Sequence, residues 1–395
     1  MRAYVFHRGT CPSSGVYCGQ GGDRVKAAEI LRSLVAIPTP SAATNLPLIE
    51  WAREFVEARG WKAWLQRYSD ENGVAKANLV ARPTAASGDG IGLAFVSHTD
   101  TVPFASSWSA ALELEERFGN LHGCGACDVK GSLACFLSAL DAVKGEADAG
   151  TGLILTADEE VGCKGMERLL ADGLPHIGTA IVSEPTSLCA GVAGKGYGLA
   201  RVIVEGVEAH SAFPGEGESA VRIAARMVER IYSLDVFPGC AVDTLFDPIC
   251  TTINVGVMEG GTAKNIIAGR CTFLAEWRPI PEDPADRVLR GIERLALEMR
   301  AIYPRARITI EPMRTEAGFK PGRDGRLRER LAGLVNKGQT GISFSSEASR
   351  LARAADEVIV IGPGDMHTAH SDREFVPVQE LEQWTAVLEK LIRPA

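Results

Sequence analysis

The chain has 395 residues, which at roughly 150 residues per domain favours two domains. Hydrophobic residues make up 46% and charged residues 23%, and this ordinary globular composition excludes a disordered or collagen-like chain. The 42 Lys and Arg residues against 50 Asp and Glu residues give a net charge of −8, so the chain lacks the basic field that nucleic-acid and anionic-membrane partners require. No run of about 18 apolar residues predicts a membrane span. We expect a protein of the cytoplasm, with its ten cysteines as thiols rather than disulfides.

The first segments in chain order are an extension and two helices. Residues 1–22 lack the continuous apolar core of a signal peptide, and we expect them to form a disordered extension. Residues 25–35 and 46–58 carry apolar side chains along one stripe each, which predicts two amphipathic helices. Four short, uniformly apolar runs come later in the chain, at residues 91–96, 153–156, 180–182 and 358–361. Such runs are typical of strands covered on both faces by helices, so they predict an α/β sandwich.

The stretch from residue 194 to residue 312 has a different pattern. Its predicted order is strand, helix, strand, strand, helix, strand, over residues 199–207, 218–233, 251–258, 271–277, 283–303 and 307–310. This is the order of a ferredoxin-like split βαβ unit. We therefore expect a second domain at 194–312, inserted into a first domain made of residues 23–193 and 313–395.

Imidazoles and carboxylates follow the ends of all four apolar runs. They are His98 and Asp100, then Asp158 with Glu159 and Glu160, then Glu184, and last His367 and His370. Open α/β sheets build their sites at the carboxyl ends of strands, so these side chains are expected to meet. Asp128 precedes an apolar-periodic helix, where Asp is a favourable N-cap. Because the four other segments supply imidazoles and carboxylates, we expect Asp128 to be a ligand instead. An acidic pair such as Glu159-Glu160 is most often a solvated loop edge, yet this one follows a buried run.

The segments offer five donor side chains of the kinds that zinc accepts: His98, Asp128, Glu160, Glu184 and His370. Five ligands, three of them acidic, exceed what one catalytic zinc needs. They fit two ions about 3.5–4 Å apart with a bridging carboxylate. Asp100 faces the same side of an extended segment as His98, so it could accept the second N–H of that imidazole. Glu159 and Glu160 point oppositely in extended backbone. One of them can bind metal while the other acts as general base for a metal-activated water.

Five motifs resemble those of one family. They are Ser-His98-Thr-Asp100-Thr-Val-Pro, Gly-Ala-Cys-Asp128-Val-Lys-Gly, Asp-Glu159-Glu160-Val-Gly-Cys, Ser-Glu184-Pro-Thr and the closing Gly362-Pro-Gly-Asp-Met-His-Thr-Ala-His370-Ser-Asp-Arg-Glu-Phe. From about Asp23 to its C-terminus the chain resembles the acetylornithine deacetylase branch of the dinuclear-zinc deacetylase and peptidase superfamily, which includes succinyl-diaminopimelate desuccinylase, aminoacylase and the carboxypeptidase G type. The resemblance implies an α/β fold: a zinc-dependent exopeptidase-like catalytic domain with an inserted ferredoxin-like lid and dimerisation domain. It also implies a homodimer.

The resemblance further implies two divalent metal ions, zinc with cobalt as an alternative. The implied ligands are Asp128 as the bridge, His98 and Glu184 on one ion, and Glu160 and His370 on the other. Glu159 would be the general base, and Asp100 would orient His98. His367 lies within one turn of His370 and is the alternative ligand, but the Asp-Arg-Glu-Phe tail favours His370.

Four more residues would act on the substrate if the resemblance holds. His210, in Ala209-His210-Ser211-Ala-Phe-Pro, would enter the neighbouring subunit's active site and stabilise the oxyanion. Asn265 and Arg278 match positions that bind substrate polar groups and carboxylate. Glu347 stands where the family usually has Gly-Thr-Glu-Ala, here in altered surroundings. Without the resemblance, a lone histidine such as His210 is usually structural, and Arg278 could equally be a surface cation.

These expectations lead to metal-dependent hydrolysis of the amide bond of a small N-acyl amino acid, with Glu159 as general base. N-acetylornithine, an intermediate of arginine biosynthesis, is the first candidate substrate. N-acetylcitrulline, succinyl-diaminopimelate and the substrates of a related dipeptidase or carboxypeptidase are the alternatives. A catalytically dead dimeric scaffold is an alternative of another class, but it predicts loss of a ligand or of the base, and all six positions hold suitable residues.

Overall fold

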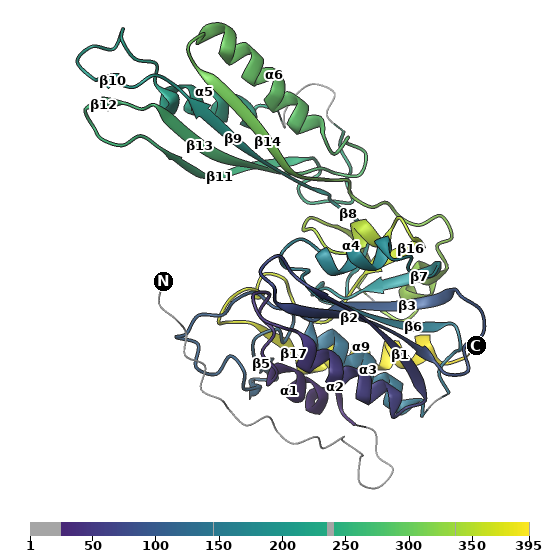
Figure 1. Cartoon of the computed structure of the whole chain (residues 1–395). Coiled ribbons are helices and arrows are strands. Elements are labelled where there is room, and N and C mark those ends of the chain that lie inside the picture. Colours follow the sequence, from purple (N-terminus) through teal and green to yellow (C-terminus); the bar gives the residue numbers. More distant parts are fainter. Residues whose placement is uncertain (1–24, 145, 235–240, 336, 395) are drawn as a thin grey trace.

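The computed structural model describes residues 25–144, 146–234, 241–335 and 337–394, and the extension expected at residues 1–22 lies outside these ranges. Two principal sheets organise the described chain, one of eight strands and one of four. Figure 1 shows them in separate lobes, which we call the large lobe and the inserted lobe (residues 197–316). Among the helices described, none combines the length and the apolar character needed to cross a lipid bilayer.

The large lobe is built on the eight-stranded sheet, whose order is β1-β2-β6-β3-β7-β16-β8-β15. Its strands are β1 (Trp61–Ser69), β2 (Ala75–Pro83), β3 (Ile91–His98), β6 (Thr151–Thr156), β7 (Ile177–Val182), β8 (Ala190–Gly194), β15 (Gln339–Ile342) and β16 (Ala355–Val360). β3 pairs in parallel with β6 and β7, and β7 pairs in parallel with β16. The four runs predicted from the sequence therefore lie side by side at the centre of the sheet.

Helices cover both faces of this sheet, as the uniformly apolar strands predict. One face carries α1 (Ala27–Val35), α2 (Leu46–Glu57), α3 (Lys130–Ala142), α7 (Arg326–Ala332) and α9 (Val378–Ile392), and the other carries α4 (Lys164–Ala171) and α8 (Ala348–Leu351). Successive residues of a strand point to opposite faces, so Phe95 joins the first core while Ala94 and Val96 join the second. The sheet is thus held rigidly from both sides.

The inserted lobe packs two helices on the four-stranded antiparallel sheet. In chain order its elements are β9 (Tyr197–Glu205), α5 (Ala220–Tyr232), β11 (Thr252–Gly260), β13 (Arg270–Arg278), α6 (Arg287–Ile302) and β14 (Arg307–Glu316). The strand order β11-β13-β9-β14 and the βαββαβ connectivity are those expected for a ferredoxin-like unit. β14 continues six residues past the predicted end at residue 310 and leads the chain back to the large lobe.

Several short or peripheral strands were not expected. β1 pairs antiparallel with β2, and β2 with β6, so one side of the sheet is antiparallel. The small sheets join β4 (Glu115–Arg117), β5 (Asn120–His122) and β17 (Phe375–Pro377), and separately β10 (Ala209–His210) and β12 (Ile266–Ile267). Figure 1 shows the β10–β12 ribbon at the end of the inserted lobe that is remote from the large lobe.

Candidate active site and metal centre

Asp128 lies at the centre of an imidazole–carboxylate cluster at the carboxyl ends of the central strands. His98, the last residue of β3, has its Nε2 3.1 Å from Asp128 Oδ1. The Nε2 of His370 lies 3.0 Å from Asp128 Oδ2 and 3.2 Å from Glu160 Oε1. Ligand atoms of His98, Asp128 and Glu160 all lie within 4.8 Å of one another. Each oxygen of one carboxylate therefore faces a different imidazole.

The carboxylate of Asp128 does not cap the following helix. Helix α3 begins at Lys130, its N-cap residue is Val129, and no side chain caps it. Asp128 is buried, and although burial opposes ionisation, hydrogen bonds from His370 and His98 hold the pKa of Asp128 below its usual value. From its position just before the helix, this carboxylate instead contacts His98 and His370.

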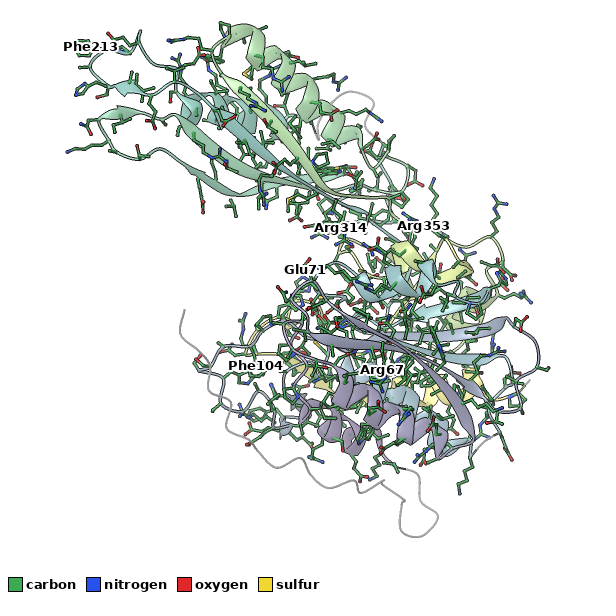
Figure 2. The ribbon with its side chains drawn as sticks, in the orientation of Figure 1. Arg67, Glu71, Phe104, Phe213, Arg314 and Arg353 are labelled. Atoms are coloured by element: carbon green, nitrogen blue, oxygen red, sulfur yellow. The ribbon has the colours of Figure 1, made fainter. Side chains whose placement is uncertain are left out.

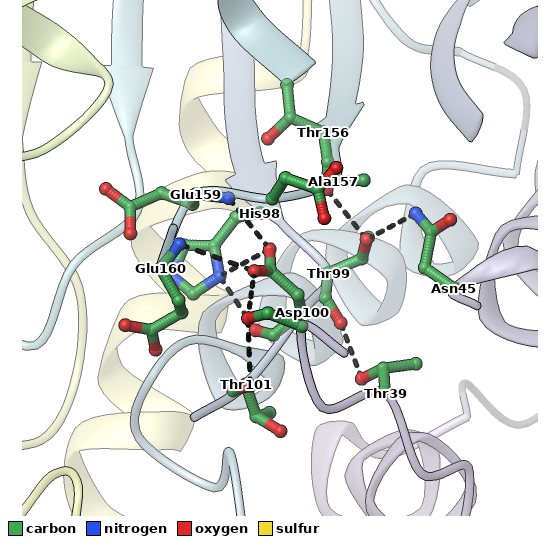
Figure 3. A network of polar contacts seen from close by, with 12 residues as sticks. Thr39, Asn45, His98, Thr99, Asp100, Thr101, Thr156, Ala157, Glu159 and Glu160 are labelled. Atoms are coloured by element: carbon green, nitrogen blue, oxygen red, sulfur yellow. Dashed lines mark hydrogen bonds and ion pairs between the residues drawn. The ribbon is translucent and has the colours of Figure 1, made fainter. Parts of the chain in front are cut away.

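Asp100 contacts His98 through its backbone carbonyl, and not through the side chain as the sequence predicted (Figure 3). The Nδ1 of His98 bonds the backbone carbonyl of Asp100 at 2.9 Å and stands 3.8 Å from its carboxylate. That carboxylate accepts the backbone N–H groups of Glu159 at 3.1 Å and Glu160 at 3.3 Å, and the Ser41 hydroxyl at 2.7 Å. Asp100 therefore ties the His98 strand to the loop that carries the acidic pair.

Two further carboxylates, the half-buried Glu159 and the buried Glu184, line the same cavity as Asp128. Burial raises the pKa of Glu159, and the neighbouring Glu160 adds to that rise. Burial also raises the pKa of Glu184, with a further contribution from Asp128. A bound cation would relieve this crowding, and the donor set of imidazoles and carboxylates fits Zn²⁺ or the similar Co²⁺. The residues present thus fit a metal centre.

The two candidate histidines in the closing motif have different surroundings. His370 contacts the cluster directly, and the hydrogen bonds that it donates to the carboxylates of Asp128 and Glu160 raise its pKa. The side chain of His367 is 93% exposed and pairs with Asp365 at 2.7 Å. The geometry therefore favours His370 as the ligand, as the motif indicates.

Two residues near the cluster were not singled out from the sequence. Buried Glu374 accepts the backbone N–H groups of Gly125 at 2.9 Å, Cys127 at 3.0 Å and Asp128 at 3.1 Å. Glu374 lies in the quoted tail after His370, but no spacing rule foretells a bond to a loop 246 residues away. Buried Cys163 donates its thiol to Glu159 Oε1 at 3.3 Å, in a sequence position that carries no signal for this contact.

A cavity of about 250 Å³ opens over the cluster and takes walls from both lobes. Its lining includes Asp128, Glu159, Glu160, Glu184 and His370 from the large lobe and Tyr197, Arg278 and Arg314 from the inserted lobe. Arg278 therefore faces the site from the inserted lobe, whereas Glu347 is 1% exposed and is not part of this lining. A larger hollow of about 690 Å³ around Lys320 and Arg353 lacks the imidazole–carboxylate group.

His210 and Asn265 are not brought to the cluster of their own chain. His210 ends β10, and the carbonyl of Asn265 accepts the Ser211 N–H at 3.0 Å, next to β12. Both side chains are exposed at the remote end of the inserted lobe (Figure 1).

The comparisons with known proteins agree on one family. The model of peptidase family M20/M25/M40 matches residues 94–393. An acetylornithine deacetylase of Myxococcus xanthus is 41% identical over 92% of this chain and 95% of its own, and one of Proteus mirabilis is 28% identical over the same shares. The fold is similar to a tripeptidase of Staphylococcus aureus, with a TM-score of 0.74 and 21% identity over 93% of this chain and 97% of that one. The chain therefore belongs to peptidase family M20/M25/M40 and is a metal-dependent hydrolase of amide bonds.

Proposed function

We propose that the protein removes the acetyl group from N-acetylornithine, as a step of arginine biosynthesis. The observation that carries this proposal is the carboxylate of Asp128, with one imidazole on each oxygen, beside the half-buried Glu159. The acetylornithine deacetylase of Myxococcus xanthus, 41% identical over nearly the whole chain, supports the choice of substrate.

Two divalent ions, zinc or cobalt, would be held by the five donor residues. Asp128 would bridge them, because its oxygens face opposite partners. His98 with Glu184 would complete one site and Glu160 with His370 the other, in keeping with the 3.2 Å separation of the last pair. Such ions polarise an acyl carbonyl and lower the pKa of water. Asp100 would fix the ring of His98 through its backbone carbonyl.

Glu159 would move the proton during hydrolysis. It accepts a proton from the attacking water, whose oxygen bonds to the acyl carbon, and returns the proton to the amine nitrogen as the C–N bond breaks. The thiol of Cys163 occupies Oε1 at 3.3 Å and so leaves Oε2 to receive the proton. Arg278 would bind the substrate carboxylate, and Asn265 and Glu347 would contribute further polar contacts.

A homodimer would complete the site. The outer strand β11 exposes Val257 and Met258 at the edge of the four-stranded sheet, and an exposed apolar edge favours pairing with another chain. With His210 remote from its own cluster, its imidazole would stabilise the oxyanion in the partner subunit. We place the enzyme in the cytoplasm, which the buried thiols of Cys124 and Cys127, not joined to each other, support.

A panel of N-acyl amino acids tests the substrate. Purified enzyme with added Zn²⁺ would be assayed for release of a primary amine from N-acetylornithine, N-acetylcitrulline, succinyl-diaminopimelate and a neutral dipeptide. We expect the highest kcat/KM for N-acetylornithine, with acetate and ornithine in equal amounts. A higher kcat/KM for another member of the panel would reassign the substrate, and no amine release from any of them would overturn the proposal.

A further inference from the structure

A hollow of about 690 Å³ lies beside the junction of the two lobes, apart from the cavity over the cluster. One of its walls is the linker at residues 317–324, through which the chain passes from β14 back into the large lobe. The other wall includes Ser349 and Arg353, and Figure 2 shows Arg353 close to the junction. This hollow, which we call the junction hollow, shares no lining residue with the cavity over the cluster.

The linker wall of the junction hollow is held tightly at two points. Phe319 is buried, and its N–H and carbonyl both bond the backbone of Gly194, at 3.0 and 3.1 Å. An added Cβ at Gly318 would stand only 2.3 Å from the carbonyl oxygen of Gly194. An added Cβ at Gly322 would stand 2.6 Å from the Cβ of Glu357. Because the linker is packed this closely, its wall is preformed, which lowers the entropic cost of binding a ligand there.

Cations outnumber acids among the residues that line the junction hollow. The cations are Lys320, Arg323 and Arg353, and the acids are Asp324 and Asp356. All five side chains belong to exposed residues. In the part of the chain that the structure describes, no carboxylate pairs with the guanidinium of Arg323 or of Arg353. Both groups therefore keep their N–H donors for a ligand.

The two acids of the junction hollow have partners outside it. Both carboxylate oxygens of Asp324 accept the Nε of Arg326, at 2.8 and 2.6 Å. A carboxylate oxygen of Asp356 lies 3.2 Å from the Nε2 of His176. Neither Arg326 nor His176 lines the hollow. The hollow thus carries an excess of positive charge, and such a surface attracts anions.

We propose that the junction hollow binds a small dianion, whose charge is carried by a phosphate monoester or by two carboxylates. Guanidinium groups form paired hydrogen bonds with phosphate and carboxylate oxygens alike. Arg323 belongs to the linker and Arg353 follows α8, so a dianion that contacts both arginines bridges the two walls. Ser349 of α8 adds a hydroxyl group to the same lining. This site is independent of the substrate that the cluster hydrolyses.

Calorimetric titration of the metal-loaded protein measures the binding. The probes are glycerol phosphate, succinate and, as a monoanion, acetate. We expect saturable binding of a dianion and much weaker binding of acetate. The affinity for the dianion should fall as NaCl is raised, because salt screens exposed charges. Tighter binding of glycerol phosphate would identify a phosphate monoester as the ligand class, and tighter binding of succinate would identify a dicarboxylate.

Arginine variants assign the binding to the junction hollow. Arg323→Gln and Arg353→Gln should each weaken binding of the dianion by about 10–100-fold, the usual effect of losing a charged hydrogen bond. Arg67→Gln is the matched control, because it removes the same charge from an exposed residue that pairs with Glu50 (Figure 2). This variant should bind the dianion as wild type does. Melting temperatures check that each variant is folded.

Hydrogen exchange of the backbone amides locates the bound dianion. We expect slower exchange in the linker at 317–324 and in α8 when the dianion is present, and no such protection in Arg353→Gln. A dianion bound at the metal cluster would instead protect the loop at 159–163 and keep its affinity in both arginine variants. That result would overturn the proposal, as would binding of acetate as tight as that of the dianions, or no saturable binding at all.

Discussion

Glu159 gathers several contacts that suit a proton carrier. Its backbone N–H is held by Asp100, its Oε1 accepts the Cys163 thiol, and its side chain lines the cavity over the cluster. Burial raises the pKa of the Cys163 thiol, which keeps that group protonated and able to donate. Asp100 and Cys163 thus orient the proposed base, and neither of them is a proposed metal ligand.

Replacing Glu159 by Gln should stop turnover and leave the metal in place. The amide cannot accept the proton of water, and loss of a general base costs about 10²–10⁴-fold in kcat. Metal content and kcat would be measured together, with Glu71→Gln as a control because the side chain of Glu71 is 74% exposed. Turnover close to that of wild type would remove Glu159 from the mechanism.

The buried ion pair of Lys76 and Asp158 stabilises the loop that carries Glu159 and Glu160. Lys76 Nζ lies 2.8 Å from Asp158 Oδ1 and donates to the carbonyls of Ser41 and Ala43, while the hydroxyl of Tyr68 donates to the other oxygen of Asp158. Asp158 directly precedes the acidic pair and has a φ of 59°. Its unusual backbone is therefore held by a charge partner that is itself buried.

Lys76→Met should destabilise the protein strongly. The substitution leaves the buried carboxylate of Asp158 without its charge partner, which typically lowers the free energy of unfolding by about 3–5 kcal/mol. Lys164→Met, which breaks an exposed pair with Glu71 at 3.3 Å, should cost about 0–1 kcal/mol. Urea unfolding of both variants gives the two free energies of unfolding. A small loss in both would mean that the pair with Asp158 contributes little.

At the scale of elements, the carboxylate of Glu374 joins two loops that approach from distant parts of the chain. One loop follows β16 and carries His370, and the other precedes α3 and carries Asp128. Three backbone N–H groups converge on Glu374, so the position of Asp128 depends on it. Glu357 is a comparable buried carboxylate away from the cluster, where it accepts the N–H of Leu327 at 3.0 Å.

Glu374→Gln should weaken metal binding by about 10–100-fold, the usual effect of losing a partner that orients a ligand. Glu357→Gln should lower the melting temperature without changing metal affinity. Competition with a chelator measures the affinity, and thermal unfolding of the metal-free variants measures the structural cost. Equal metal affinity in the two variants would assign Glu374 a purely structural role.

How far the sequence predicts these elements depends on burial. The central strands β3, β6, β7 and β16 were predicted because strands covered on both faces are uniformly apolar. β1 was not, because it is half exposed, with Trp64 at 52%, and pairs only at one edge of the sheet. The strands β4, β5 and β17 have three residues each, too few for a periodic pattern.

In the candidate site, too, some features could be predicted from the sequence and others could not. Its side chains follow strand ends, so His98, Asp128, Glu160 and His370 could be expected to meet, and the structure brings them together. The contacts of Glu374, and the choice of the backbone carbonyl of Asp100 over its carboxylate, depend on exact distances between loops far apart in sequence. No local pattern encodes those distances.

For the whole molecule, the β10–β12 ribbon lies remote from the large lobe, so the role proposed for His210 requires a second subunit. His210→Ala should bind metal normally and lose about 10²–10³-fold in kcat, the cost of one oxyanion donor. If His210 acts in the partner subunit, mixing His210→Ala with Glu159→Gln under subunit exchange should restore activity. A mixed dimer then holds one site with both groups intact. Demonstrated exchange without recovered activity would show that His210 does not act in the partner's site.

Metal removal tests most directly whether the cluster around Asp128 hydrolyses the acetyl amide. Wild-type protein and Asp128→Ala would be stripped with a chelator, assayed on N-acetylornithine, and assayed again after Zn²⁺ or Co²⁺ is returned. We expect stripped wild type to be inactive and to recover acetate release with the returned ions, because Asp128, the proposed bridging ligand, is intact. Asp128→Ala should retain little metal and stay inactive throughout. Full turnover in the stripped wild type, or in Asp128→Ala, would contradict a metal-dependent amide hydrolase centred on this carboxylate.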